Sequence, residues 1–152
     1  MATNNRTLVD TNILLDLVTK DEKWGEWSVA QLEAAAAKGP LFVNKVIFAE
    51  LSVRFDSAKS VLTMLDGMKI DFADIPHDAL FLAGKAFSQY RKAGGTRQGV
   101  LPDFFIGAHA QVVGTPLLTR DTGRFSTYFP SVPLITPTTV PPLAGASKPL
   151  VH

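Results

Sequence analysis

The chain has 152 residues, of which 46% are hydrophobic and 19% charged, and its formal net charge is +1. This length favours one domain with a sizeable core. The absence of cysteine excludes disulfides and thiolate–zinc sites. No apolar run approaches the roughly 20 residues of a membrane span, and the N-terminal residues do not resemble a signal peptide. We expect a soluble, cytoplasmic protein that does not bind a membrane, and the near-neutral charge neither indicates nor excludes a nucleic-acid partner.

Short apolar runs alternate along the chain with longer helical segments. Expected strands cover residues 6–9, 41–43, 70–75, 116–118 and 133–135. Expected helices cover residues 10–18, 26–38, 45–55, 57–68, 77–92 and 103–113. This alternation predicts an α/β fold, a three-layer α/β/α sandwich with a mostly parallel central sheet. We expect one domain over residues 1–136 and a proline-rich tail over 137–152 that is extended and loosely held.

Four acidic residues stand next to apolar segments, where an isolated charge is costly. Asp10 and Asp121 each follow an expected strand, Asp103 opens a helix, and Glu50 lies within an apolar helix. Because ligand crevices lie beyond the carboxyl ends of parallel strands, these acids can converge on one rim of the sheet. Carboxylates that are close together raise one another's pKa unless a cation joins them. The set therefore indicates a divalent metal site of an enzyme that acts on phosphates.

Each acid also has a purely structural interpretation. Asp10 and Asp103 are suited to the N-terminal end of a helix, and Asp121 to a turn after a strand. Glu50 can pair with Arg54, four residues later on the same helix. The bare helix face around Gly107 suits either close packing or the approach of a substrate. His109 lies about 240° around the helix from Asp103 and points away from it, as expected of a structural histidine.

Four segments, taken together, resemble the PIN-domain ribonucleases, and within them most closely the VapC toxins of VapBC toxin–antitoxin modules. The resemblance covers residues 6–136, nearly the whole chain. The segments that carry it are Asp10-Thr11-Asn12 after the first strand, Glu50 in a central helix, the run from Pro102 and Asp103 to Ala110, and Leu117-Leu118-Thr119-Arg120-Asp121. Many relatives carry Asn at the position of Asp121 and an acid slightly later, where this chain has Arg124.

The resemblance implies a parallel α/β/α sandwich and an Mg²⁺-dependent ribonuclease, with Mn²⁺ as a possible substitute. It implies a homodimer that is silenced by a cognate VapB-like antitoxin. RNA would be hydrolysed by a metal-activated water, which leaves a 5′-phosphate and a 3′-hydroxyl and needs no histidine base. The residues that would hold the metal and act in catalysis are Asp10, Glu50, Asp103 and Asp121, with Thr11, Asn12 and Thr119 as polar groups that support them.

Two further surfaces are predicted beside this centre. Arg97, in the glycine-rich loop before Asp103, and Arg120, beside Asp121, are the best candidates for contacts to RNA phosphates. Trp24 and Trp27, together with Leu14, Leu17 and Val18, suit either an apolar groove for an antitoxin segment or plain core packing.

Two other function classes remain open from the sequence. The same carboxylates suit a nuclease that acts on DNA, or one that processes RNA without an antitoxin. They also fit a non-catalytic protein-binding module in which the acids serve only as caps and ion pairs. Substrate tests and Asn variants of Asp10 and Asp103 discriminate among these readings.

Overall fold

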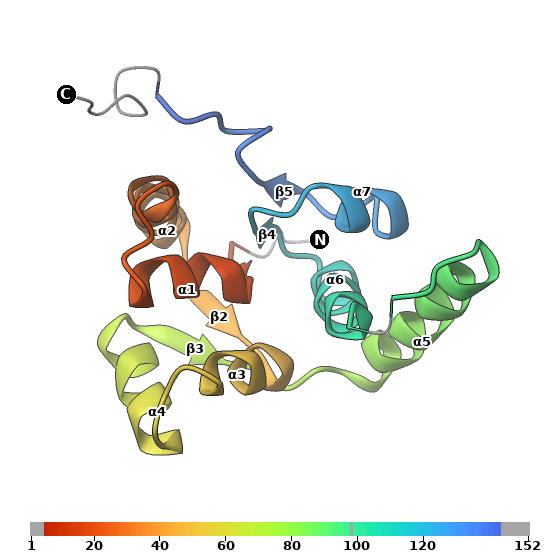
Figure 1. The fold of residues 1–152 in the computed structure, drawn as a ribbon, viewed down its shortest axis with the longest axis horizontal. Helices are drawn as coiled ribbons and strands as arrows, with labels where there is room; N and C mark the ends of the chain where they lie inside the picture. The colour runs from red at the N-terminus through yellow and green to blue at the C-terminus, as the bar shows by residue number, and fades with distance from the viewer. Residues whose placement is uncertain (1–4, 98, 144–152) are drawn as a thin grey trace.

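The computed structural model describes residues 5–97 and 99–143. Five short strands form one sheet (Figure 1): β1 (Thr7–Val9), β2 (Leu41–Val43), β3 (Ile70–Phe72), β4 (Leu117–Leu118) and β5 (Leu134–Ile135). The helices are α1 (Thr11–Val18), α2 (Gly25–Lys38), α3 (Lys45–Ser52), α4 (Ala58–Gly67), α5 (His77–Lys92), α6 (Leu101–Val113) and α7 (Gly123–Tyr128). None of the described helices is both long enough and apolar enough to span a bilayer.

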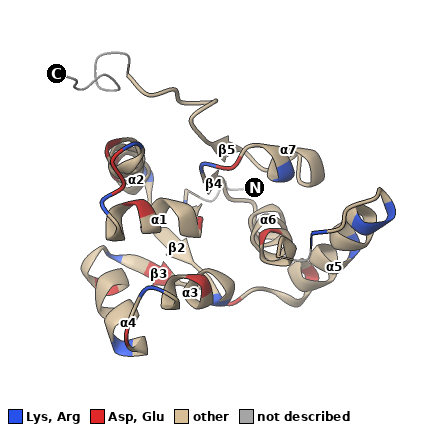
Figure 2. Ribbon diagram, viewed as in Figure 1, with Lys and Arg blue, Asp and Glu red and all other residues tan. Residues whose placement is uncertain are grey.

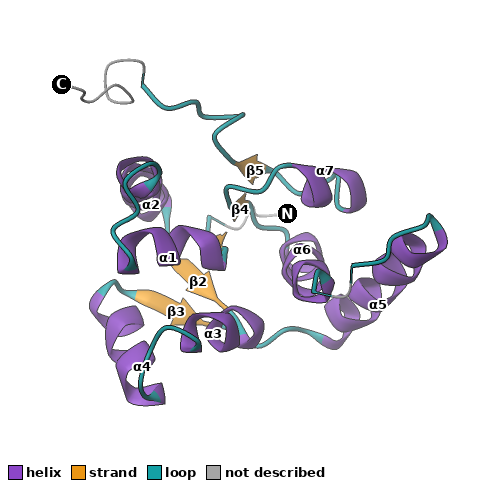
Figure 3. Ribbon diagram, in the orientation of Figure 1, coloured by secondary structure: helices purple, strands orange, loops and turns teal. Residues whose placement is uncertain are grey.

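All strand pairs in the sheet are parallel, and the strand order is β3-β2-β1-β4-β5. In the register, Leu8 lies between Phe42 on one side and Leu117 on the other. The chain runs outward from β1 to β3 and then returns past β1 to β4 and β5. Right-handed crossovers therefore place the helices of the two halves on opposite faces of the sheet. The predicted α/β/α fold with a parallel sheet is confirmed, and Figure 3 shows the strands flanked by helices.

The buried strands explain why the core is continuous. Leu8, Val9, Phe42 and Val43 are fully buried on the sheet, as is typical of a parallel sheet that is covered on both faces. Gly107 lets the other layer pack closely, because a Cβ atom there would lie 2.3 Å from a ring carbon of Phe129. The bare face of α6 is thus filled by a core side chain, which decides between the two interpretations of Gly107 in favour of packing.

Several predicted boundaries shift in the structure. Helix α6 begins at Leu101 rather than at Asp103, because Pro102 is well suited to the first turn of a helix. Helix α3 ends at Ser52, three residues earlier than expected, and β3 covers only residues 70–72 of the predicted 70–75. Helix α7, which separates β4 from β5, was not predicted.

The start of the predicted C-terminal tail is held against the domain, so this part of the tail is not loose. Thr136 is buried, and its carbonyl oxygen accepts a hydrogen bond from the Val140 amide at 2.7 Å. The Val140 carbonyl in turn accepts a hydrogen bond from the Trp27 indole at 2.7 Å. These bonds tie residues 136–140 to α2. Residues 141–143 are exposed, and residues 144–152 of the predicted tail lie outside the described residues.

Candidate active site

The four predicted acids lie near the place where the strand order changes direction, between β1 and β4. β1 and β4 are neighbours at this reversal, and the Asp10 amide donates a hydrogen bond to the Leu118 carbonyl at 2.9 Å. The ends of both strands therefore meet at the crevice where parallel sheets bind ligands. Figure 2 shows acidic segments of α1, α3 and α6 around this region.

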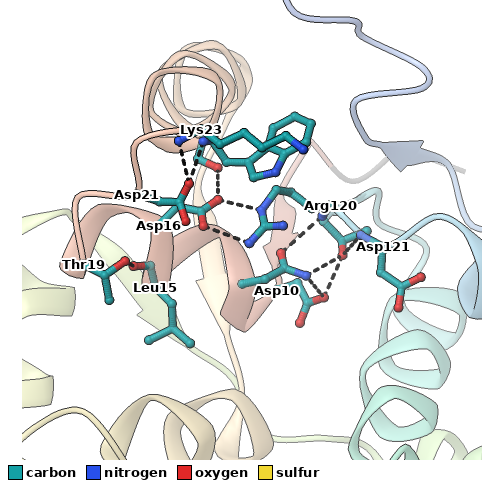
Figure 4. Close-up of polar contacts among 12 residues, drawn as sticks. Asp10, Leu15, Asp16, Thr19, Asp21, Lys23, Arg120 and Asp121 are labelled. Atoms are coloured by element: carbon teal, nitrogen blue, oxygen red, sulfur yellow. Dashed lines mark hydrogen bonds and ion pairs between the residues drawn. The ribbon is translucent and has the colours of Figure 1, made fainter.

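Asp10 is the most enclosed of the four acids, with 4% of its surface exposed. One carboxylate oxygen, Oδ1, caps α1 by accepting the Thr11 amide at 2.7 Å. The other, Oδ2, accepts the Thr119 hydroxyl at 2.7 Å and the Asn12 side-chain amide at 3.3 Å (Figure 4). Neutral donors from two adjacent strand ends therefore hold this side chain in one orientation.

Glu50 is joined to Asp10 through a single residue. The Thr11 hydroxyl donates a short hydrogen bond to Oε1 of Glu50, while the Thr11 backbone amide binds Asp10. This contact, and not the ion pair with Arg54 that the sequence allowed, fixes the Glu50 side chain. Thr11 thus links the end of β1 to the centre of α3.

Asp103 and Asp121 share a cationic neighbour. Nη1 of Arg124 contacts Oδ2 of Asp103 and lies 3.6 Å from Oδ2 of Asp121. Asp121 is also held by its own turn, because its Oδ1 accepts the Gly123 amide at 3.0 Å and its amide binds the Thr119 hydroxyl at 3.0 Å. The residue that the sequence marked as a departure from the family pattern therefore lies inside the acidic centre.

The electrostatics show that negative charge in this centre is not fully compensated. Burial raises the pKa of Asp10 to about 7, and the neighbouring Asp103 and Glu50 carboxylates add to this rise. Burial likewise raises the pKa of Asp103 to about 6, against the opposing effect of Arg124, and Asp121 and Glu50 raise it further. Repulsion therefore couples Asp10, Glu50 and Asp103 with one another, and couples Asp121 with Asp103.

The donor chemistry of this centre fits a hard divalent cation. Its ligating atoms are carboxylate oxygens, which Mg²⁺ prefers, without the imidazole or thiolate ligands of softer metals. Across residues 5–97 and 99–143, no three His, Cys, Asp or Glu side chains are packed closely enough to enclose a metal ion. Metal binding by Asp10, Glu50, Asp103 and Asp121 therefore remains a prediction that is based on donor type and unbalanced charge.

A second buried carboxylate, which the sequence analysis missed, lies two turns away on the same helix. Asp16 is 2% exposed and binds the guanidinium of Arg120 through two hydrogen bonds of 2.8 and 2.9 Å. The Ser28 hydroxyl also donates to Asp16, at 2.6 Å, and Arg120 lies over the ring of Trp24. Figure 4 shows this cluster beside Asp10. Arg120, which was predicted to contact phosphate, therefore has a structural role as well.

The loop after β4 is tied to α1 along its length. The Arg120 amide donates to Oδ1 of Asn12 at 3.2 Å, and the Asn12 side-chain amide also approaches Thr119 at 3.4 Å. Asn12 and Asp16 are four residues apart and so share one face of α1. This spacing places Asp16 on the same face as Asn12, but it does not identify Arg120 as the partner of Asp16.

Other predicted residues lie apart from the acids. Arg97 is exposed, and its amide binds the Tyr90 hydroxyl at 3.1 Å. His109 is buried against Phe42 and Asn44, and burial, together with Arg6, lowers its pKa to about 4. It is a neutral core residue, as its position on the helix predicted.

Of the two interpretations of Trp24 and Trp27, the structure supports core packing. Leu14 and Trp27 are buried in the core, and Trp24 packs edge-on against Trp27. An open cavity of about 540 Å³ does lie between α1 and α2, but of the five predicted residues only Leu17 lines it. Trp24 and Trp27 therefore pack as core residues, and the open cavity is lined by other residues.

The fold agrees with known structures. The chain is similar to VapBC2 from Rickettsia felis bound to a DNA fragment from its promoter, at 18% identity and a TM-score of 0.67, over 86% of this chain and 98% of that one. It is similar to VapBC-1 from nontypeable Haemophilus influenzae, at 15% identity and 0.65, over 88% and 98%. It is also similar to FitAcB from Neisseria gonorrhoeae, at 21% identity and 0.61, over 87% and 98%.

No curated protein sequence matches the chain at a significant level. Residues 7–128, in contrast, match the family model of the PIN domain, and this range runs from β1 to the end of α7. It contains all four acids of the centre. The chain therefore belongs to the PIN-domain family.

Proposed function

We propose that this protein is a metal-dependent endoribonuclease, the toxin of a VapBC-type toxin–antitoxin pair that acts in the cytoplasm. The observation that carries the proposal is the group of carboxylates that repel one another beside the carboxyl ends of β1 and β4. Burial raises the pKa of Asp10 and of Asp103; Asp103 and Glu50 raise that of Asp10 further, and Asp121 and Glu50 that of Asp103, as expected of a site that is built around a cation.

The residues of the centre have separable roles in this proposal. Asp10, Glu50, Asp103 and Asp121 hold Mg²⁺, or Mn²⁺ in its place. A bound divalent ion supplies a nucleophile at neutral pH and neutralises charge on the phosphate. Thr11, Asn12 and Thr119 fix the directions of the Asp10 and Glu50 oxygens through the hydrogen bonds described above. Arg97 and Arg120 contact RNA phosphates, Arg120 with the part of its guanidinium that Asp16 leaves accessible.

The partner proposal rests on the similar structures. Two of those named above are described as VapBC2 and VapBC-1, and a further one is described as a toxin–antitoxin complex from Klebsiella pneumoniae. By analogy we propose a VapB-like antitoxin for this chain, and a homodimer of the chain within the complex. The cavity between α1 and α2 is a candidate for part of the antitoxin contact, since it is open and combines Leu17 and Val29 with charged groups.

The test is cleavage of a small-RNA pool by the purified chain with Mg²⁺, with Mn²⁺ and with a chelator. Asp10→Asn and Asp103→Asn are each expected to reduce cleavage roughly a thousandfold, since metal-centred charge stabilisation supplies several kcal/mol. Asp66→Asn, at an exposed position on α4, is the control. Products should carry 5′-phosphate ends. Cleavage that persists with the chelator would contradict the proposal. Cleavage of DNA but not of RNA would show that the enzyme is a DNA nuclease.

A further inference from the structure

Arg124 is built into the acidic centre and is not a free surface charge. Its side chain is 17% exposed, and it projects from α7 next to Phe125, which is fully buried. Phe125 anchors the short helix in the core, so the guanidinium is directed at Asp103 and Asp121 by the fold itself. An arginine stays protonated at any physiological pH, so its positive charge is permanent.

The acids of the centre form two pairs, Asp10 with Glu50 and Asp103 with Asp121, and the two pairs have different partners. Asp10 and Glu50 receive hydrogen bonds from hydroxyl and amide groups that carry no charge. Asp103 and Asp121 instead share the guanidinium of Arg124. Asp103 belongs to both sides, because it is also coupled to Glu50 and Asp10 by repulsion. The uncompensated charge is therefore concentrated on the Asp10–Glu50 side.

We infer that Arg124 is a fixed counter-charge that fills the Asp103–Asp121 side of the centre and limits it to one divalent cation. This narrows the four proposed ligands to Asp10, Glu50 and Asp103, with Asp121 paired to Arg124 instead. The inference rests on the proposed function, since it takes the centre to bind metal. Two-metal sites place their ions about 3.5–4 Å apart. A second ion beside Asp121 would meet the guanidinium in that space, and the total positive charge would exceed that of the four carboxylates.

The experiment counts bound ions on the purified, chelator-treated chain and uses no RNA. Mn²⁺ binding is followed by the electron paramagnetic resonance signal of the free ion, and Mg²⁺ binding by calorimetry. The variants are Arg124→Gln, which removes the charge, and Arg124→Lys, which keeps it. Arg54→Gln is the control, because it removes the same charge from an exposed position near the end of α3. Circular dichroism shows that each variant is folded.

The unchanged chain, Arg124→Lys and Arg54→Gln are each expected to bind one Mn²⁺. Arg124→Gln should bind two, and it should bind the first about tenfold more tightly, because a nearby positive charge has been removed. Two ions on the unchanged chain would overturn the inference, and so would identical binding by the unchanged chain and Arg124→Gln. The inference also falls if no chain binds a divalent ion, an outcome that in addition removes the metal from the proposed function.

Discussion

Two buried aspartates at the start of the chain have opposite surroundings. Asp10, the cap of α1, is 4% exposed, and Asp16, on the same helix, is 2% exposed. Asp16 faces a guanidinium that binds it through two hydrogen bonds, and a hydroxyl adds a third. Asp10 receives only neutral donors and faces two other carboxylates. A buried acid with its own cation is part of the framework, whereas a buried acid among other acids marks a binding site.

The largest effect on stability is expected from removing Asp16, the aspartate that has its own cation. Asp16→Ala leaves the buried part of Arg120 and the Ser28 hydroxyl without their partner. It should lower the free energy of unfolding by about 3–5 kcal/mol, as is typical when one member of a buried ion pair is removed. Urea denaturation measures the change.

The double variant Asp16→Ala/Arg120→Ala provides the control for this prediction. The unpaired charge is then absent, so the double variant should lose less stability than the sum of the two single variants. If Asp16→Ala costs under about 1 kcal/mol, the ion pair is not the framework element described here.

Asp10, the aspartate without a cation, should make the stability of the fold depend on pH. The folded pKa of Asp10 is about 7, above its ordinary value of 3.8. Between these values the folded state holds more protons than the unfolded state, so stability falls as pH rises. Asp10→Asn keeps the side chain neutral at all pH values. It should match the metal-free parent near pH 4 and exceed it at pH 8, by at most about 4 kcal/mol.

The measurement is the difference in unfolding free energy between Asp10→Asn and its parent from pH 4 to pH 8. His109 acts in the opposite direction, because its lowered pKa makes stability rise with pH in the acidic range. This contribution is present in both proteins, so it cancels when their unfolding free energies are subtracted. A difference that stays constant with pH would show that Asp10 is compensated after all. Asp66→Asn serves as the exposed control.

A smaller loss of stability is expected from disturbing the close packing of α6 against Phe129. Gly107→Ala would place a Cβ atom 2.3 Å from the ring of Phe129 and should cost about 1–3 kcal/mol through overpacking. Gly84→Ala on α5 is the matched control, because no atom lies within 4 Å of a Cβ there. Alanine favours the helix at both positions, so Gly84→Ala should stabilise the chain by up to about 1 kcal/mol. Thermal unfolding separates the two, and equal shifts would contradict the close contact.

The fold was predictable because its signals are local. Apolar strands that alternate with helices indicate a parallel sheet wherever they occur. Helix α7 was missed because its six residues, GRFSTY, include few strong helix formers, and Thr122 provides no side-chain cap. The contact of the first tail residues was not predictable, because the hydrogen bond that holds them joins Trp27 to Val140, 113 residues apart.

The centre was predictable only in part, for the same reason. Asp10 follows a strand and begins a helix, so its position at the rim of the sheet can be inferred from its neighbours in sequence. The partners of Asp16 are Ser28 and Arg120, which lie 12 and 104 residues further along. No local pattern shows that Arg120 is bound by Asp16, or that Arg124 folds back onto Asp103. Ion-pair choice therefore depends on tertiary packing that one sequence does not display.

The bond between Asp10 and Thr119 spans 109 positions of the chain, and this has a consequence for biosynthesis. Ribosomes deliver the chain from its N-terminus, and domains fold as they emerge. Asp10 is then made long before β4, Thr119 and Arg124. A nascent chain that lacks β4 and α7 lacks the partners that Thr119 and Arg124 provide to Asp10 and Asp103. The acids of the centre can therefore come together only after β4 and α7 have been synthesised.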